Sequence, residues 1–215
     1  MYDLPYYKEN DKEIILQFIQ KHPFAFLAGC DENQKPVATH VPVFIEEREG
    51  VYYLTGHIMR KTDHHMAFMK NPDVLVIFTG PHTYVSAACY SNPHQASTWN
   101  YISVHTKGKI KFLDEDALVG VLKKLTLHFE NNNPESSTIF DNHSEEYKQP
   151  LMKAIVAFEI EVKSIENVFK LSQDRDEASY NNIIQKLTGQ GGDSKLIADE
   201  MKKRTSQLFS TGKKK

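Results

Sequence analysis

Two cationic side chains and a hydroxyl group follow a strand-like segment in the first third of the chain. Arg60, Lys61 and Thr62 come directly after the run VYYLTGHIM, where a helical pattern begins. Backbone N–H groups at a helix N-terminus favour an anion, and an arginine offers a bidentate fork to phosphate. These residues are therefore a candidate monophosphate cradle, and a solvated, charged first turn is the alternative interpretation.

A second group of aromatic and imidazole side chains lies in residues 79–108, which hold the chain's only tryptophan. Side chains alternate along a strand, so Ile102 and Val104 belong to a core face that Asn100 shares. Trp99, Tyr101 and His105 share the opposite face. Large aromatic side chains that point away from a core are usually covered by a helix, another subunit or a planar ligand. Plain burial and a ligand-facing role both remain open from these residues.

Histidines elsewhere give weaker signals. His40 lies among apolar neighbours in PVATHVPVFIE, where a lone strand histidine is more often structural than catalytic. A metal site is not favoured, because the HExxH spacing is missing and the adjacent His64 and His65 would diverge by about 100° on a helix. No nucleophile signature surrounds Cys89, and neither GxGxxG nor GxxxxGK[ST] occurs. Catalytic residues stay unassigned.

Composition indicates a globular cytoplasmic protein. The 215 residues are 40% hydrophobic and carry a formal net charge of −2, which gives no general case for nucleic acid or an anionic membrane as partner. Two cysteines exclude a disulfide framework and suit a reducing compartment. The polar start of the chain is unlike a secretory signal, and no apolar run approaches the ~20 residues that span a bilayer. The basic tail TGKKK is expected to be a frayed terminus.

The order of the expected elements predicts a mainly β fold with flanking helices. A helix over 10–22 is followed by strand-like runs over 24–29, 35–46 and 51–57, a helix over 59–70, and strands over 74–78, 97–113 and 153–165. Further helices are expected over 114–129, opened by Asp114, and over 177–187 and 194–204, which the glycines of GQGG separate. The charged or glycine-bearing turns CDENQK and EEREG separate the first three strand-like runs and predict two consecutive hairpins. Five or six strands at hairpin spacing predict a small antiparallel barrel. We expect one barrel domain over 1–170, with its N-terminal helix, and a C-terminal helical extension over 171–215.

Several segments resemble one known family in their order along the chain. These are MYDLPYY, ATHVPVF, YLTGHIMR, VLVIFTGPHTYVS, STWNYISVHTKGKIKFLD, IVAFEIEV and VFKLSQDRD. Together they resemble the FMN-binding negative transcriptional regulator family, the PaiB-like group, over essentially residues 1–187. The resemblance implies an FMN-binding split β-barrel, and such proteins are generally homodimers with flavin at the subunit interface.

The resemblance also implies a set of cofactor-binding residues. Phosphate would be held at Arg60 and Lys61, with Thr62 a further candidate. The isoalloxazine ring would be lined by two strand segments and approached by a third, from the same barrel or from the partner: Thr39, His40, Val41; Thr55, Gly56, His57; and Trp99, Asn100, Tyr101, His105.

Two segments depart from the family pattern. The family commonly has GHMARANPQ where this chain has GHIMRKTDHH, so Gly56, His57 and Arg60 carry over, and Lys61 and Thr62 are local substitutions. The common YVSPSWY is YVSAACY here, so Cys89 replaces a tryptophan and bulk is removed beside the expected binding region.

Four functional hypotheses follow. The first is a dimeric FMN-binding protein acting in regulation or sensing, and the second is a flavin-dependent oxidoreductase on a small substrate. DNA repression, suggested by the family name alone, would need a basic recognition helix, for which SKLIADEMKKRTSQLF is the best candidate. The favoured interpretation of that segment is a solvated amphipathic helix that packs through Leu196, Ile197 and Met201. A split barrel that has lost its cofactor is the last alternative.

Overall fold

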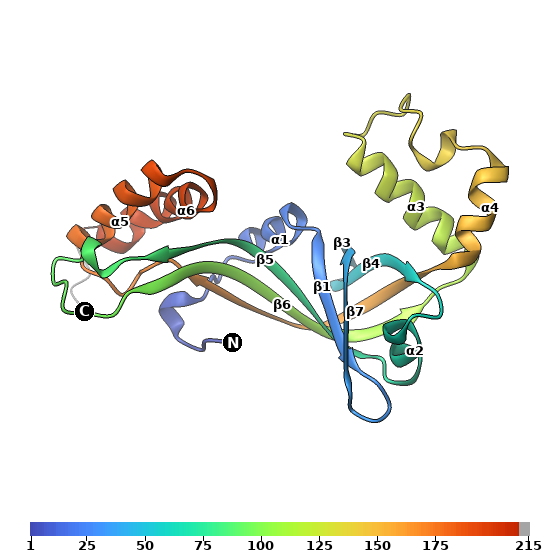
Figure 1. Cartoon of the computed structure of the whole chain (residues 1–215), viewed down its shortest axis with the longest axis horizontal. Coiled ribbons are helices and arrows are strands. Elements are labelled where there is room, and N and C mark those ends of the chain that lie inside the picture. Colours follow the sequence, from blue (N-terminus) through green and yellow to red (C-terminus); the bar gives the residue numbers. More distant parts are fainter. Residues whose placement is uncertain (211–215) are drawn as a thin grey trace. The chain divides into compact units, whose positions relative to one another are not determined.

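The computed structural model describes residues 1–210 (Figure 1). The basic tail TGKKK lies outside the described residues. Seven strands form one sheet, and their bounds are β1 Phe24–Cys30, β2 Pro36–Pro42, β3 Phe44–Arg48, β4 Val51–Met59, β5 Asp73–Val85, β6 Thr98–Phe112 and β7 Ile155–Lys170. The α-helices are α1 Lys12–Lys21, α2 Asp63–Lys70, α3 Glu115–Phe129, α4 Glu145–Ala154, α5 Glu177–Gln190 and α6 Gly192–Phe209. Short 3-10 helices cover Pro5–Tyr7 (η1), Ala87–Cys89 (η2) and Phe140–Asn142 (η3).

The sheet is built from two hairpins joined to three long strands. Its order is β2-β1-β5-β6-β7-β4-β3. β1 pairs with β2 and β3 pairs with β4, both antiparallel, which confirms the two consecutive hairpins expected from the sequence. β1 also pairs with β5, and β4 with β7, again antiparallel. The fold is therefore mainly β with flanking helices, as predicted.

The segment predicted as one strand over 35–46 is in fact two. β2 ends at Pro42 and β3 begins at Phe44, and these strands occupy opposite edges of the sheet. Proline has no N–H to continue a ladder, and the N–H of Val43 instead donates to the Pro23 carbonyl at 2.8 Å. Because Val43 alone connects the two edge strands, the sheet must curl until its edges meet.

The closure of the sheet is visible at Gly56 of β4. A Cβ atom at this position would lie 2.9 Å from the carbonyl oxygen of Pro42 in β2 and 2.8 Å from the ring of Phe158 in β7. β2 also contacts β4. Glycine is therefore required where one edge of the sheet approaches the other.

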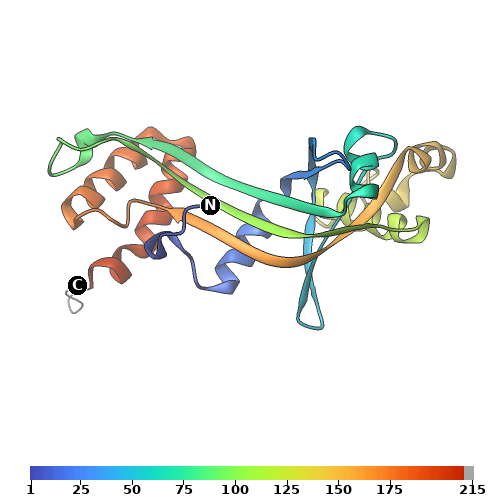
Figure 2. The ribbon, with the colours of Figure 1, turned by 90° about the horizontal axis from the view of Figure 1, so that it is seen from below.

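Two compact units share the three long strands. The first comprises residues 1–18, 79–104 and the described residues from 166 onward, and the second comprises residues 19–78 and 105–165. The expected division into a barrel domain over 1–170 and a helical extension stays a prediction. β5, β6 and β7 each run through both units, which Figures 1 and 2 show as three long neighbouring ribbons.

In the first unit, α5 and α6 pack side by side and α6 covers part of β5 and β6 (Figures 1 and 2). The hydroxyl groups of Thr83 and Ser194 are 2.7 Å apart. Tyr180 is fully buried and donates its hydroxyl to the Met201 carbonyl at 2.9 Å. The glycines of GQGG separate the two helices as expected, since Gly191 has a φ of +74°.

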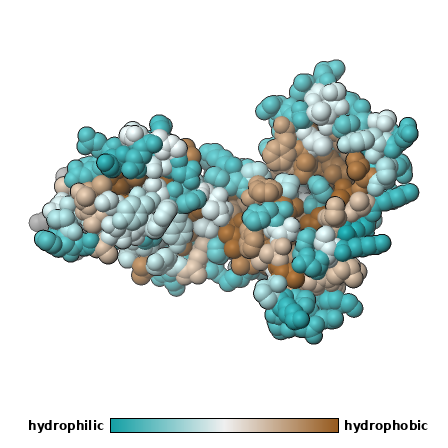
Figure 3. Space-filling model, in the orientation of Figure 1, coloured by the Kyte–Doolittle hydropathy of each residue, from teal (hydrophilic) through white to brown (hydrophobic). Residues whose placement is uncertain are grey.

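In the second unit, α2 packs on β1 and β2, and α3 contacts β4. The predicted cap of α3 is confirmed, because the Asp114 carboxylate accepts the Ala117 N–H at 2.9 Å. α3 nevertheless buries only Leu118, and α4 buries no residue. Figure 3 shows apolar surface gathered around these two helices, where Phe129 and Leu151 are about half exposed (50% and 49%).

The alternation predicted for β6 is confirmed by burial. Ile102, Val104 and Ile110 are at most 5% exposed, whereas Trp99 is 54% exposed. Two predictions nearby were incomplete. β5 continues to Val85, so residues 79–85 are strand rather than loop, and α4 was not predicted because Pro150 interrupts its pattern. Among residues 1–210, no helix is both long and apolar enough to cross a membrane.

Close packing at Gly108 gives a direct test of the sheet. A Cβ atom there would lie 2.3 Å from the backbone oxygen of Glu161, which cannot move without shifting β7. We expect Gly108→Ala to lower the free energy of unfolding by about 1–3 kcal/mol in urea titrations, the usual cost of overpacking. Gly120→Ala is the matched control, because the position is helical and open, and the change is expected to stabilise by up to about 1 kcal/mol. Equal effects of the two substitutions would contradict the packing.

Candidate functional site

The link between β4 and α2 is a tight turn of three residues, Arg60 to Thr62. Thr62 caps α2, since its hydroxyl oxygen accepts the His65 N–H at 3.3 Å. The same hydroxyl donates to the Met59 carbonyl at 3.0 Å. Because its one hydrogen is already used, Thr62 shapes the turn and is not a free donor to phosphate.

Lys61 occupies the left-handed region of backbone space, with a φ of +63°. This conformation is uncommon for a residue with a side chain and needs support from its surroundings. The support comes from His65, whose Nδ1 accepts the Lys61 N–H at 3.1 Å. His65 is 7% exposed and packs against the Phe112 ring with centroids 4.8 Å apart. The turn is thus fixed from the interior while the Lys61 side chain stays exposed.

Arg60 is anchored by the start of β7. Its backbone N–H donates to the Ala154 carbonyl and its Nε to the Ile155 carbonyl, both at 2.8 Å. Within residues 1–210, the terminal nitrogens of Arg60 and the Lys61 ammonium group have no hydrogen-bond partner. The turn therefore presents two adjacent cations, one of them with an oriented fork, and both can bind an anion.

The N-terminus of α2 offers an anion fewer free backbone N–H groups than the sequence suggested. The His64 N–H donates to the Asp63 carboxylate at 2.7 Å, and the His65 N–H is taken by Thr62. The hydrogen bonds from His64 lower the pKa of Asp63, so this residue is a carboxylate at neutral pH. A phosphate would be repelled by this group, which limits the cradle to Arg60 and Lys61.

The outer face of β4 carries Thr55 and His57. Leu54 and Ile58 point into the core, at 0% and 5% exposure, whereas Thr55 and His57 are half-buried. The Nδ1 atom of His57 is buried without a hydrogen-bond partner among the described residues. Burial lowers the pKa of His57, so its imidazole is neutral at pH 7. Its ring is available as a neutral hydrogen-bonding group beside the turn.

The predicted β2 residues divide between the two faces of the strand. Val41 is 3% exposed and belongs to the core, and Thr39 is half-buried. His40 is exposed and packs on Phe24 and Phe26, with ring centroids 5.7 and 5.0 Å apart. His40 therefore stabilises the hairpin of β1 and β2 through its aromatic neighbours.

The predicted β6 residues belong to different units. Trp99, Asn100 and Tyr101 lie in the first unit, and the half-buried His105 lies in the second with the residues of β2, β4 and the turn. Asn100 is fully buried, where its carbonyl oxygen accepts the Ser172 hydroxyl at 3.0 Å and its amide contacts the Met201 sulfur at 3.7 Å. Asn100 therefore fixes the interior of the first unit.

An aromatic cluster around Trp99 was missed at the sequence level. The rings of His82 and Tyr84 each lie with their centroids 6.1 Å from that of Trp99, and Tyr84 is 51% exposed. The buried Lys170 donates to the Trp99 carbonyl at 2.8 Å and also to Thr98. Alternation over 79–85 would have revealed the cluster, had the strand been extended to Val85.

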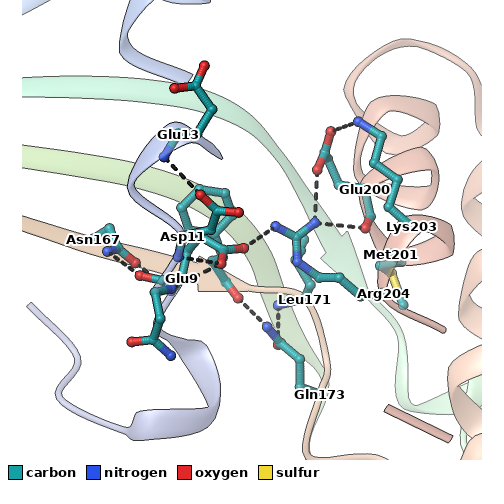
Figure 4. A network of polar contacts seen from close by, with 12 residues as sticks. Glu9, Asp11, Glu13, Asn167, Leu171, Gln173, Glu200, Met201, Lys203 and Arg204 are labelled. Carbon is teal, nitrogen blue, oxygen red and sulfur yellow. Dashed lines mark hydrogen bonds and ion pairs between the residues drawn. The ribbon is translucent and has the colours of Figure 1, made fainter. Parts of the chain in front are cut away.

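The basic residues of α6 are held in ion pairs (Figure 4). Arg204 contacts Glu200 and, from the N-terminal segment, Glu9, each at 2.9 Å. Lys203 pairs with Glu200 as well. Asn167 of β7 donates to the Glu9 carbonyl at 3.0 Å, so the network joins three parts of the first unit. These contacts favour packing as the role of α6. Within the described residues no group of three or more His, Cys, Asp or Glu could hold a metal ion.

The sheet order and its closure define the split-barrel class of folds. Two solved structures have a similar fold. The FAD and heme binding protein of Mycobacterium smegmatis has a TM-score of 0.56 at 19% identity, covering 75% of this chain and 72% of that one. The flavocytochrome Anf3 of Azotobacter vinelandii has a TM-score of 0.52 at 17% identity, covering 75% and 68%. At these identities the likeness concerns the fold.

Residues 1–164 match the family described as "Putative FMN-binding domain". The sequence is also 33% identical over 209 residues to the protease synthase and sporulation protein PAI 2 of Bacillus subtilis, covering 95% of this chain and all of that protein. The chain therefore belongs to the PaiB-like FMN-binding family, as its motifs indicated. A protein of Emericella nidulans, uncharacterized protein AN0679, is 24% identical over 95% of this chain and 97% of its own length. Family membership supports FMN as the cofactor.

The two histidines of the site predict a pH dependence of stability. Burial lowers the pKa of both His57 and His65, and nearby Arg60 and His64 lower that of His65 further. The unfolded chain therefore binds more protons below its ordinary histidine pKa of about 6.5, and stability falls as the pH drops through and below that value. His65→Gln, which keeps an acceptor for the Lys61 N–H, is expected to flatten part of this slope in urea titrations between pH 5 and 7.5. His94→Gln at an exposed position is the control, and an unchanged slope in His65→Gln would contradict the assignment.

Proposed function

We propose that this chain binds FMN and that Arg60 and Lys61 hold the phosphate group. The observation that carries the proposal is the turn itself. Arg60 is exposed and fixed through its Nε to β7, its two terminal nitrogens are unpaired within the described chain, and Lys61 follows directly. A guanidinium fork already oriented by the protein loses little freedom when phosphate binds. The residues present thus suit the phosphate of the cofactor that the family implies.

The ring of the cofactor would lie along the outer face of β4. Thr55 and His57 share that face and lead to the turn, while Gly56 and Val41 point inward and could contribute backbone groups only. His57 would offer a neutral imidazole, and His40 and His105 lie in the same unit. Bound FMN would supply a redox-active isoalloxazine ring, and the chain's own residues would bind and orient it.

We further propose a homodimer that acts in cytoplasmic regulation or sensing. Trp99 and Tyr84 in the first unit are more than half exposed, and so is Tyr147 of α4 in the second (54%, 51% and 55%). Exposed aromatic surface of this kind is expected to be covered in the working protein. Trp99 and Tyr101 could then approach the flavin from the same barrel or from the partner. Free thiols at Cys30 and Cys89 suit a reducing compartment. Sedimentation velocity tests the dimer, and a species with the mass of one chain across the micromolar range would contradict it.

Single substitutions in the turn test the phosphate site. Each charge-assisted hydrogen bond lost should weaken binding by about 1.5–3 kcal/mol, which corresponds to about 10- to 100-fold in Kd. We expect Arg60→Ala to show this loss in titrations that follow flavin fluorescence, and Lys61→Ala a smaller one. Arg60→Lys should rescue only part of it, because the fork and its anchor are lost.

Lys70→Ala provides the matched control, since Lys70 is exposed at the other end of α2 and has no ion pair among the described residues. Its affinity for FMN should equal that of the unmodified chain. Unchanged affinity in both Arg60→Ala and Lys61→Ala, with the fold intact by circular dichroism, would exclude the turn as the phosphate site.

A further inference from the structure

The first unit contains a hollow between η2 and α5, and none of its lining residues belongs to the turn from Arg60 to Thr62. Its volume is about 520 Å³, and it is lined by Ala88, Cys89, Asn182, Gln185, Lys186, Gly189 and Gln190. The five α5 residues follow a spacing of three and four, so they form one stripe of the helix. The opposite stripe, which includes Ile183 and Leu187, is buried at 0% and 2% exposure. We call this hollow the η2–α5 groove.

The segment around η2, which forms one wall of the groove, is hydrogen-bonded to the start of α5. The Ser91 N–H donates to the Ser179 hydroxyl at 2.8 Å, and the Ser91 hydroxyl donates to Asp176 at 3.0 Å. At its other end, the Ala87 N–H donates to the Ser97 hydroxyl at 3.0 Å. Hydrogen bonds on both sides of η2 therefore fix one wall of the groove.

Four of the seven side chains that line the groove are polar, and all four are exposed. Asn182, Gln185, Gln190 and Lys186 have no side-chain hydrogen bond or ion pair within the described part of the chain. Three amides supply donors and acceptors, and one ammonium group supplies a positive charge. No carboxylate lines the groove. The lining is therefore complementary to a small anion that carries further hydrogen-bonding groups.

Both walls of the groove include small residues. Cys89, on the η2 side, is half-buried. On the helix side, a Cβ atom at Gly189 would meet nothing within 4 Å, so no contact in the described chain requires glycine there. Glycine within a helix costs about 1 kcal/mol relative to alanine. Small residues on both walls leave space for a molecule.

We propose that the η2–α5 groove is a binding site for a small organic carboxylate, with Lys186 as its counter-ion and the three amides as hydrogen-bonding partners. This site shares no residue with the turn that is proposed to hold the FMN phosphate. A protein that senses a small metabolite would use such a surface.

Cys89 supplies the readout, because its thiol lines the groove while the second cysteine, Cys30, belongs to β1 in the other unit. The probe is iodoacetate, a small carboxylate that alkylates thiolates with loss of iodide, and iodoacetamide is its neutral counterpart. Mass spectrometry of the full chain follows both cysteines in one reaction. We expect the ratio of iodoacetate to iodoacetamide rates to be about threefold to fivefold higher at Cys89 than at Cys30, the size of one exposed charge pair. The iodoacetate rate at Cys89 should also saturate with concentration.

Three variants separate the groove from general effects of charge. Lys186→Gln should abolish the carboxylate preference at Cys89, and Gly189→Leu should abolish saturation by filling the groove at an open helical position. Lys12→Gln removes an exposed charge elsewhere in the same unit and should change neither. Equal ratios at both cysteines, or the same loss in Lys12→Gln as in Lys186→Gln, would overturn the proposal. FMN affinity should stay unchanged in all three variants.

Discussion

One covalent constraint determines the fold around the turn between β4 and α2. β2 and β3 occupy the two edges of a seven-stranded sheet, yet Val43 alone connects them in the chain. A flat sheet would place these edges several strands apart, at about 4.8 Å per strand. The sheet must therefore close on itself, and it does so where Gly56 meets the Pro42 carbonyl. Closure of the sheet is therefore enough to require glycine at position 56 of β4, with no need for a ligand.

Closure also prepares the turn that follows β4. Pairing of β4 with β7 brings Met59 opposite Ile155, so the chain leaves β4 beside the first residues of β7. The carbonyls of Ala154 and Ile155 then hold the backbone and Nε of Arg60. On the inner side, His65 supports the left-handed Lys61. Two neighbouring cations are consequently fixed by groups from β7 and α2 rather than by their own flexible side chains.

Local patterns in the sequence predicted the parts of this arrangement that depend on neighbouring residues. Alternation identified the core face of β6, and charged turns located both hairpins. Features that depend on distant residues could not be predicted in the same way. The break at Pro42 and the extension of β5 to Val85 are determined by strand pairing across the fold. The helix α4, which buries no residue, was missed because Pro150 interrupts its pattern. For the site, the sequence pointed to Arg60 and Lys61, and their role stays a prediction. It could not show that the Thr62 hydroxyl is occupied as a cap, that the Asp63 carboxylate accepts an N–H of α2, or that Asn100 is engaged internally.

The comparison of FMN with riboflavin tests the central claim most directly. The two molecules share the isoalloxazine ring and differ in the phosphate group that Arg60 and Lys61 are proposed to hold. Titration of the purified protein with each, followed by flavin fluorescence, should give a Kd for FMN that is lower by about 10-fold or more. Equal affinity for both flavins would contradict a phosphate site at the turn between β4 and α2, and failure to bind FMN would contradict flavin binding by this chain altogether.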